Sequence, residues 1–406
     1  MKQDAERSDG YEDSELYLFQ TDCLIKQSKY EEAIKFLKRS EDSIVDMLSH
    51  KVKLAELYVL SGKFNEARTS WTHLVLEQPD NYRFHCGLQV SYLELDPTTS
   101  LEMFSLKKLQ LPSTTLQLSK EQMVVLKDMY VASNFKTRNV SKILLTVCSD
   151  RDELKVALDK HLRSSLHNAM PALYHDIFSL VSIPDPVNQS SHVVFASDPI
   201  DIKQHEVILI TRELVDKYIS NLRSHEQFED LYDPSLPLEP PTSFLWALYL
   251  KAHILEMCNE LKEALAVIDE SIQHTPTAID MYCKKARILK KLGDVITAAV
   301  VMDDCRMLDL QDRYLNNKAT KYYLRIDETE LAMNTIALFV KHDGEPQKTL
   351  YDLQCSWYEL EVGESFARTK QWGGALRKFH AIKKHFFDYI HDMIDFHSYC
   401  VRKVSV

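Results

Sequence analysis

Apolar residues recur every three or four positions along most of the chain, the spacing that places them on one face of an α-helix. Residues 52–79 show the pattern clearly. Apolar positions beginning at Leu54 form one stripe, those beginning at Phe64 form a second, and Gly62 lies between the two stripes. Glycine accepts the left-handed conformation that often ends a helix. The pattern therefore predicts two helices joined by a short turn.

This hairpin pattern repeats with a fixed period. An alanine near the start of the second helix recurs 34 residues later in the N-terminal region and at two successive 34-residue steps in the C-terminal half, with a sixth alanine 43 residues further on. The six are Ala33, Ala67, Ala264, Ala298, Ala332 and Ala375. A 34-residue period is that of tetratricopeptide repeats, and a small residue suits the point where paired helices approach most closely. The sequence predicts an all-α fold, an α-α superhelix of such repeats.

We expect three segments along the chain. Residues 1–112 carry N-terminal repeats, residues 113–206 form an irregular helical middle that ends in a polar loop at 182–206, and residues 207–406 carry C-terminal repeats. The last segment opens with a proline-rich stretch at 227–242. Because a residue before proline disfavours the helical conformation, we expect this stretch to be an extended linker that ends at a helix start.

Composition supports the helical assignment and narrows the function. Only 8 of 406 residues are glycine, too few for a glycine-rich phosphate loop or a tight-turned β fold. The formal net charge of -11 disfavours nucleic acid and anionic lipid, except at a local basic patch. The 8 cysteines are scattered without a CxxC pair, which is typical of reduced thiols. With no apolar signal segment and no run long enough for a membrane span, we expect a cytoplasmic protein with no membrane or sequence-specific nucleic-acid partner.

A search for catalytic and metal-binding motifs finds none. Nucleotide-binding glycine loops, the paired-histidine zinc motif and the nucleophile elbow are absent from the sequence. The 16 histidines are dispersed, and a lone histidine among aromatic residues is more often a core or surface residue than a ligand. We therefore expect no catalytic residue and no metal site, and an enzyme of unknown type is the least favoured hypothesis.

Two basic clusters stand out against the acidic background. Residues 284–291 contain five lysines and arginines, and residues 366–387 contain six with no carboxylate. Each cluster alone is equally compatible with an exposed, solvated helix face. Their occurrence in consecutive repeats slightly favours an anion-binding surface.

The most specific constellation lies in residues 312–325. Three cations and a phenol spaced i, i+3, i+4 and i+7 share one helical face, with a further arginine one turn earlier, near a helix start that favours anions. These five residues are Arg313, Lys318, Lys321, Tyr322 and Arg325. Ala319 and Tyr323 take the core positions of the repeat, so we expect the basic face not to be needed for the fold. A phosphate-rich ligand would suit this face, and pairing with carboxylates of a neighbouring repeat is an almost equal alternative.

Several segments also resemble a known family. The stretches EPPTSFLWALYLKAHIL (239–255), HTPTAIDMYCKKARILKKLGD (274–294), MLDLQDRYLNNKATKYYLR (307–325), LYDLQCSWYELEVGESFAR (350–368) and DFHSYCVRK (395–403) look like the auxiliary subunit of the NatA N-terminal acetyltransferase. A weaker match reaches back to YEDSELYLFQ (11–20), so the resemblance covers nearly the whole chain. These stretches include residues outside the core positions that a generic repeat requires.

The resemblance implies a non-catalytic α-solenoid that wraps a small catalytic subunit and tethers it to the ribosome for co-translational N-terminal acetylation. It also implies inositol hexakisphosphate as a structural ligand, held by the five residues of 313–325 named above. Acetyl-CoA would bind only to the partner, because no segment of this chain matches the [QR]xxGx[GA] turn that holds its pyrophosphate. The loop at 182–206 departs from the family pattern. Family members extend beyond both ends of this sequence, so we expect a fragment or a truncated gene model.

A second hypothesis is a generic tetratricopeptide adaptor that clamps the C-terminal peptide of a partner, as chaperone-binding modules do. Such a clamp needs cations and amides that converge on one carboxylate in a groove. The candidates are Lys284, Asn316, Asn317 and Lys321. Loss of peptide binding on C-terminal amidation would support this reading.

Overall fold

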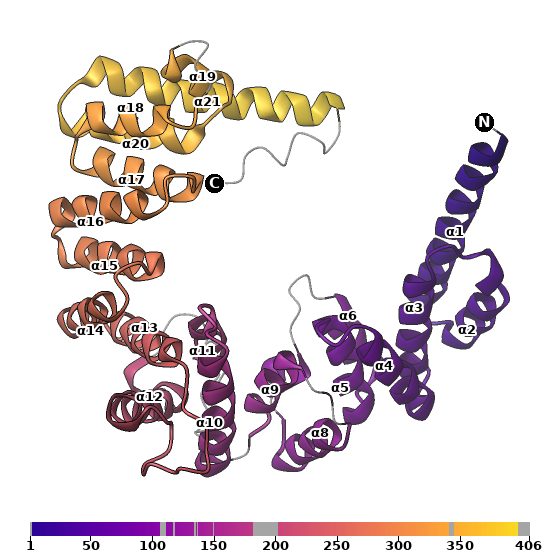
Figure 1. The fold of residues 1–406 in the computed structure, drawn as a ribbon. Helices are drawn as coiled ribbons and strands as arrows, with labels where there is room; N and C mark the ends of the chain where they lie inside the picture. The colour runs from indigo at the N-terminus through magenta and orange to yellow at the C-terminus, as the bar shows by residue number, and fades with distance from the viewer. Residues whose placement is uncertain are drawn as a thin grey trace. The chain divides into compact units, whose positions relative to one another are not determined.

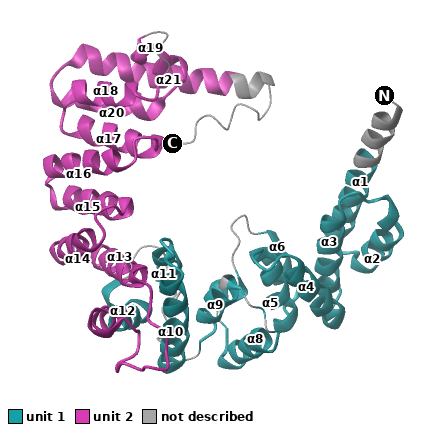
Figure 2. Ribbon diagram, viewed as in Figure 1, with its two compact units in different colours: residues 1–214 teal, residues 215–406 magenta. Residues whose placement is uncertain are grey.

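The structure is a computed structural model that describes residues 2–105, 111–116, 118–133, 135, 137–148, 150–181, 202–340 and 345–396. Within these ranges every regular element is a helix, which confirms the predicted all-α class. The chain divides into two compact units, residues 1–214 and 215–406 (Figure 2). This division does not test the three predicted segments, which remain a prediction.

The first unit begins with paired helices and continues with helices of unequal length (Figure 1). Its elements are α1 (Lys2–Lys26), α2 (Tyr30–Arg39), the 3-10 turn η1 (Glu41–Ser43), α3 (Met47–Leu60), α4 (Phe64–Glu77), α5 (Tyr82–Leu93), α6 (Pro97–Ser105), α7 (Pro112–Thr115), α8 (Lys120–Ala132), α9 (Arg138–Leu145), α10 (Arg151–His167), α11 (Leu173–Val181) and the 3-10 turn η2 (Ile202–Gln204). The boundary between the units falls within α12 (Glu206–His225).

The second unit is a run of antiparallel helix pairs that stack in chain order (Figure 1). Its further elements are α13 (Pro241–Met257), α14 (Leu261–His274), α15 (Ile279–Leu292), α16 (Val295–Leu308), α17 (Arg313–Arg325), α18 (Thr329–Ala337), α19 (Pro346–Asp352), α20 (Ser356–Arg368) and α21 (Trp372–Phe396). Neighbouring core clusters share a helix, so α15 and α17 contribute to two clusters apiece. The repeat prediction is confirmed for these pairs.

The six alanines picked out by the period are all buried at the close approach of a helix pair. Five have no exposed surface and Ala375 is 3% exposed. In α1–α2, α3–α4, α13–α14, α15–α16, α17–α18 and α20–α21, the alanine stands five positions after a residue with left-handed backbone. These six residues, with φ between 58° and 92°, are Ser28, Gly62, Asn259, Gly293, Asp327 and Lys370.

One main-chain hydrogen-bond pattern closes every one of these turns. The N–H of the residue after the left-handed position donates to the carbonyl five residues earlier, at 2.7 to 3.1 Å. This is the bond that satisfies a free carbonyl at a helix C-terminus in a Schellman motif. The turn geometry is therefore set by the main chain, and glycine occupies it at only two of the six sites.

The helices between the repeats are irregular, as predicted for the middle of the chain. α8 has 13 residues, α9 has 8, α10 has 17 and α11 has 9. Residues 182–201 of the predicted polar loop lie outside the described residues, and the loop's last residue, Glu206, is the first of α12. The predicted proline-rich linker, residues 227–242, contains no helix until α13 begins at Pro241.

Candidate functional site

The cationic face predicted in residues 312–325 belongs to α17. Asp312 caps the helix, because its carboxylate accepts hydrogen bonds from the backbone N–H of Tyr314 at 2.6 Å and of Leu315 at 3.4 Å. Leu315 and Ala319 are buried in the core cluster formed with α15 and α16. The cap and these apolar anchors fix the helix rotation, and the lysines and the two arginines are then left at its more exposed positions.

Aromatic rings hold the cations of this face in place. Lys318 lies 5.1 Å from the centre of the Tyr314 ring, and Lys321 lies 4.7 Å from the centre of the Trp357 ring on α20. Arg325 lies 5.7 Å from the centre of the Tyr322 ring. Cations over aromatic faces at such distances are attracted by the ring quadrupole. Aromatic rings, and not carboxylates, thus lie beside most cations of this face.

A lysine of the neighbouring repeat joins the same group. Lys290 of α15 lies 5.7 Å from the centre of the Tyr322 ring, on which Arg325 also rests. Burial lowers the pKa of Lys290, and the charges of Arg325, Arg287 and Lys318 lower it further. Sequence inspection placed Lys290 in a separate cluster, because only the packing of α15 near α17 brings it to this face.

The positive charge of this face is only partly balanced. Arg325 pairs with Glu361 of α20 at 3.2 Å. Among the described residues, no carboxylate forms an ion pair with Arg313, Lys290, Lys318 or Lys321. Burial lowers the pKa of Lys321, Glu361 opposes this effect, and the neighbouring cations Lys318 and Arg325 add to it. An anion placed among these side chains would relieve their mutual repulsion.

The structure does not place Tyr322 on the open face that was predicted for it. Its side chain is buried, with 7% exposure, within the core cluster of α15, α16 and α17. Burial raises the pKa of its phenol, which the charge of Arg325 opposes. The expectation that the basic face is independent of the fold was therefore wrong for Tyr322, because a helix stripe inferred from spacing cannot show how deeply the next repeat covers it. Ala319 takes the predicted core position, and Tyr323 is half-buried against the next cluster.

Comparison with known proteins identifies the fold and the family. Residues 11–197 and 202–406 match the family described as "N-terminal acetyltransferase A, auxiliary subunit". The chain belongs to this family. The resemblance noted in the sequence is thereby confirmed.

Relatives of the NatA auxiliary-subunit family match over almost the whole chain. The Arabidopsis thaliana "N-terminal acetyltransferase A complex auxiliary subunit NAA15" is 32% identical over 97% of this chain and 40% of its own length. The human "N-alpha-acetyltransferase 16, NatA auxiliary subunit" is 26% identical over 98% of this chain and 40% of its own length. The chain therefore spans about two fifths of the length of these relatives.

A solved structure described as "Structure of Naa15/Naa10 bound to HypK-THB" has the same fold. It aligns with a TM-score of 0.70 and 24% identity, over 97% of this chain and 51% of the other chain. This similarity supports the helical-repeat solenoid predicted from the 34-residue period.

Four of the five cations in the first basic cluster form ion pairs, with two carboxylates between them. The side chains of Lys284, Arg287 and Lys291 all pair with Glu256 of α13, at 2.8 Å from Arg287 and 2.7 Å from Lys291. Lys285 pairs with Asp269 at 2.8 Å. Among the described residues, Lys290 is the one cation of 284–291 that forms no ion pair.

The spacing of residues in the sequence did not single out Glu256. Its side chain is 4% exposed. Burial alone would raise its pKa, but the hydrogen bonds from Lys284 and Lys291 outweigh burial and lower the pKa to about 2. Burial, only partly offset by Glu256, lowers the pKa of Lys284 to about 8. At neutral pH the centre is therefore one carboxylate shared by three cations.

The second basic cluster is partly paired and partly free. Arg368 pairs with Asp327 at 3.0 Å and Lys378 with the fully buried Glu359 at 2.9 Å. Arg377, Lys383 and Lys384 remain exposed on α21. The last helix thus keeps an exposed basic strip of these three residues.

The residues proposed for a peptide clamp do not converge on a groove. Lys284 is 3% exposed and its ammonium is engaged by Glu256. Asn316 is 1% exposed and donates to the carbonyl of Thr335 at 2.9 Å. Because two of the four candidates are buried in the helix packing, the geometry does not favour the adaptor hypothesis.

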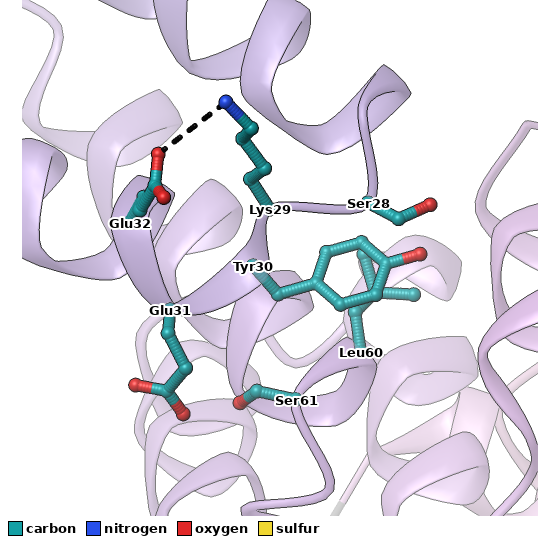
Figure 3. A pocket seen from close by; sticks show the side chains of 7 residues that line it. All are labelled: Ser28, Lys29, Tyr30, Glu31, Glu32, Leu60 and Ser61. Atoms are coloured by element: carbon teal, nitrogen blue, oxygen red, sulfur yellow. Dashed lines mark ion pairs between the residues drawn. The ribbon is translucent and has the colours of Figure 1, made fainter.

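Other polar groups offer no better chemistry. A shallow depression between the α1–α2 and α3–α4 turns is lined by Ser28, Lys29, Tyr30, Glu31, Glu32, Leu60 and Ser61, and Lys29 pairs with Glu32 there at 3.8 Å (Figure 3). These residues bring no nucleophile and base within hydrogen-bond distance. No group of three or more metal-ligating side chains occurs in the described part of the chain. None of the helices described there is long and apolar enough to cross a membrane.

Proposed function

We propose that this chain is a non-catalytic scaffold that holds the catalytic subunit of an N-terminal acetyltransferase. The family match over nearly all of the chain carries this proposal. The solved structure of the same fold contains Naa15 together with Naa10, which supports a catalytic partner. Without the acetyl-CoA turn motif in its sequence, the chain depends on the partner for acetyl-CoA and for the transfer step. Its own contribution is a preorganised surface that spans several repeats.

The test is to combine the purified chain with the catalytic subunit and measure acetylation of peptides that begin with Ser or Ala. We expect the two proteins to co-elute and the acetylation rate to rise above that of the catalytic subunit alone. The chain alone should give no acetylated product. A rate unchanged by the chain, or acetylation by the chain without a partner, would contradict the proposal.

The cationic face of α17 is proposed to bind inositol hexakisphosphate at the boundary with the catalytic subunit. Its ligands are Arg313, Lys318, Lys321, Tyr322 and Arg325, to which the geometry adds Lys290. The support for this assignment is the excess of cations over carboxylates on a face ordered by aromatic rings. Each hydrogen bond between a charged donor and a phosphate is worth about 1.5–3 kcal/mol.

Substitution of Lys321 tests the assignment. We expect Lys321→Glu to weaken inositol hexakisphosphate binding by at least about tenfold, since it removes one charged contact and adds a repulsive charge. Isothermal titration and the ligand-induced rise in melting temperature measure the effect. The matched control is Lys262→Glu, an exposed lysine of α14 outside this face. Equal weakening in both variants would show a non-specific charge effect, and no weakening in Lys321→Glu would remove the assignment.

We further propose that the complex is cytoplasmic and associates with ribosomes near the emerging nascent chain. The exposed basic strip of Arg377, Lys383 and Lys384 on α21 supports contact with ribosomal phosphates. Such a contact should weaken steeply with salt, because it releases counterions. Co-sedimentation with ribosomes at increasing salt tests this, with a triple glutamine variant of the strip. Sedimentation equal to that of the unchanged protein would argue against the strip.

A further inference from the structure

Two cysteines face each other across the α15–α16 helix pair. The Sγ atoms of Cys283 on α15 and Cys305 on α16 lie 3.3 Å apart, and both residues are free thiols. A disulfide bond is about 2.05 Å long, so an approach of about 1.3 Å would join the two sulfur atoms. The two helices pack directly against each other, which holds the thiols at this separation.

The two thiols have unequal environments. Cys305 has no exposed surface, and its Sγ also lies 3.5 Å from the carbonyl oxygen of Ile279, whereas Cys283 is only half-buried. The hydrogen bond to Cys283, together with burial, raises the pKa of Cys305. The same hydrogen bond lowers the pKa of Cys283, with help from Lys318, while burial, Asp280 and Asp312 oppose it. Cys283 is thus the more accessible and more nucleophilic sulfur, and Cys305 stands behind it.

Two other buried cysteines, Cys86 and Cys148, are less favourably placed for reaction. Burial raises the pKa of Cys86 to about 12 and that of Cys148 to about 11. Each is buried, with exposures of 5% and 3%. Thiols of this kind react slowly with a small disulfide in solution, because the thiolate is the nucleophile and burial blocks the approach of the disulfide. Cys86 and Cys148 therefore serve as references against which the reactivity of Cys283 and Cys305 can be measured.

We propose that Cys283 and Cys305 form a redox-active pair that closes to an intramolecular disulfide by exchange with a small disulfide such as oxidised glutathione. The Cys283 thiolate attacks one sulfur of oxidised glutathione, which forms a mixed disulfide and releases one glutathione thiolate. Cys305 passes its proton to that thiolate and attacks Sγ of Cys283, and the second glutathione leaves as a thiolate that takes a proton from water. Two protein thiols are oxidised and one glutathione disulfide is reduced to two thiols.

Closure has a consequence for the cationic face. Cys305 and Tyr322 belong to the same core cluster, against which Cys283 packs. Lys290 of α15 and Arg325 of α17 both rest on the Tyr322 ring. A covalent link between α15 and α16 therefore stiffens the layer beneath these cations. The inference is independent of the proposed scaffold role, because it concerns only the chemistry of the two sulfur atoms.

The experiment treats the purified chain with oxidised glutathione, alkylates the remaining thiols and identifies the modified peptides by mass spectrometry. We expect a crosslink between the peptides that contain Cys283 and Cys305, reversed by dithiothreitol, and loss of the Cys283 thiol at least about tenfold faster than that of Cys86. In Cys305→Ser, whose hydroxyl can still donate to Ile279, a stable glutathione adduct should accumulate on Cys283. Cys258→Ser, a change at a buried cysteine of α13–α14, should leave the crosslink unchanged.

Three outcomes would overturn the proposal. The first is a glutathione adduct on Cys283 of the unchanged protein that persists without a crosslink. The second is modification of Cys283 no faster than that of Cys86, and the third is no loss of thiols at all. Circular dichroism verifies that the variants fold. If Cys305→Ser fails to fold, Cys283→Ser provides the second test, because Cys305 should then remain unmodified.

Discussion

The carboxylate of Glu256 gives a stringent test of how α13 is held to α15. It accepts from Lys284, Arg287 and Lys291 on the neighbouring repeat, and its side chain is 4% exposed. The change Glu256→Gln keeps the shape and one acceptor oxygen but removes the charge. Three cations are then left around a neutral amide, and one of them, Lys284, has a side chain only 2% exposed.

The expected cost follows from the pKa of Glu256. The folded structure lowers this pKa from 4.5 to about 2. At 1.36 kcal/mol for each pH unit, the ionised carboxylate stabilises the fold by roughly 3 kcal/mol relative to its protonated form. Removal of one partner of a buried ion pair commonly costs about 3–5 kcal/mol, which agrees with this magnitude. We expect Glu256→Gln to lower the free energy of unfolding at pH 7 by about 3 kcal/mol.

The sign of the pH dependence is also fixed. Because the pKa is depressed in the folded state, the stabilisation is fully present above pH 4.5 and is lost as the pH falls toward 2. The difference between the unchanged protein and Glu256→Gln should therefore shrink over this range. Urea unfolding followed by circular dichroism at a series of pH values measures it.

A matched control is Asp269→Asn, which removes the carboxylate from a partly exposed pair with Lys285 at 2.8 Å. Exposed pairs contribute about 0–1 kcal/mol, so this variant should unfold almost as the unchanged protein does. A cost for Glu256→Gln no greater than that of Asp269→Asn, or a difference that stays constant between pH 7 and pH 3, would refute the reasoning.

Two further predictions concern packing and turns. Gly87→Ala should lower stability by about 1–3 kcal/mol, because a Cβ there would lie 2.2 Å from Cε2 of the buried Trp71. Gly373→Ala, in an open helical position, should instead be neutral or stabilising by up to about 1 kcal/mol, and equal effects in thermal unfolding would contradict the packing argument. Lys370→Gly should stabilise the α20–α21 turn by about 1 kcal/mol, because Lys370 is exposed with φ of 61°. Gly62→Ala, at φ of 75°, should destabilise its turn by a similar amount, and the same sign for both changes would count against the turn geometry.

Much of the fold could be predicted because its signals are local. Each buried alanine lies in the same hairpin as the helix stripe it packs against, so a fixed spacing in the sequence corresponds to a fixed contact in space. The irregular middle could be recognised only by its lack of that period. Its individual helices had no comparable signal, since α8 to α11 differ in length from one another.

The candidate site depends on contacts between repeats, and the spacing of residues along the sequence does not reveal these contacts. Spacing placed Lys318, Lys321 and Arg325 on one helix face, and in the structure they are the partly exposed cations of α17. Spacing could not show that Glu256, from the previous repeat, pairs with three of the five cations in 284–291. Nor could it show that Tyr322 is covered by the packing of α15 and α16.

The shared turn geometry has a consequence for how such chains diverge. Since main-chain bonds close all six turns, the left-handed position can pass from glycine to serine, asparagine, aspartate or lysine without loss of the hairpin. Each such exchange carries a modest conformational penalty that a well-packed array can absorb. Within this chain, glycine thus marks only two of the six turns, whereas the buried alanine five places downstream is present in all six.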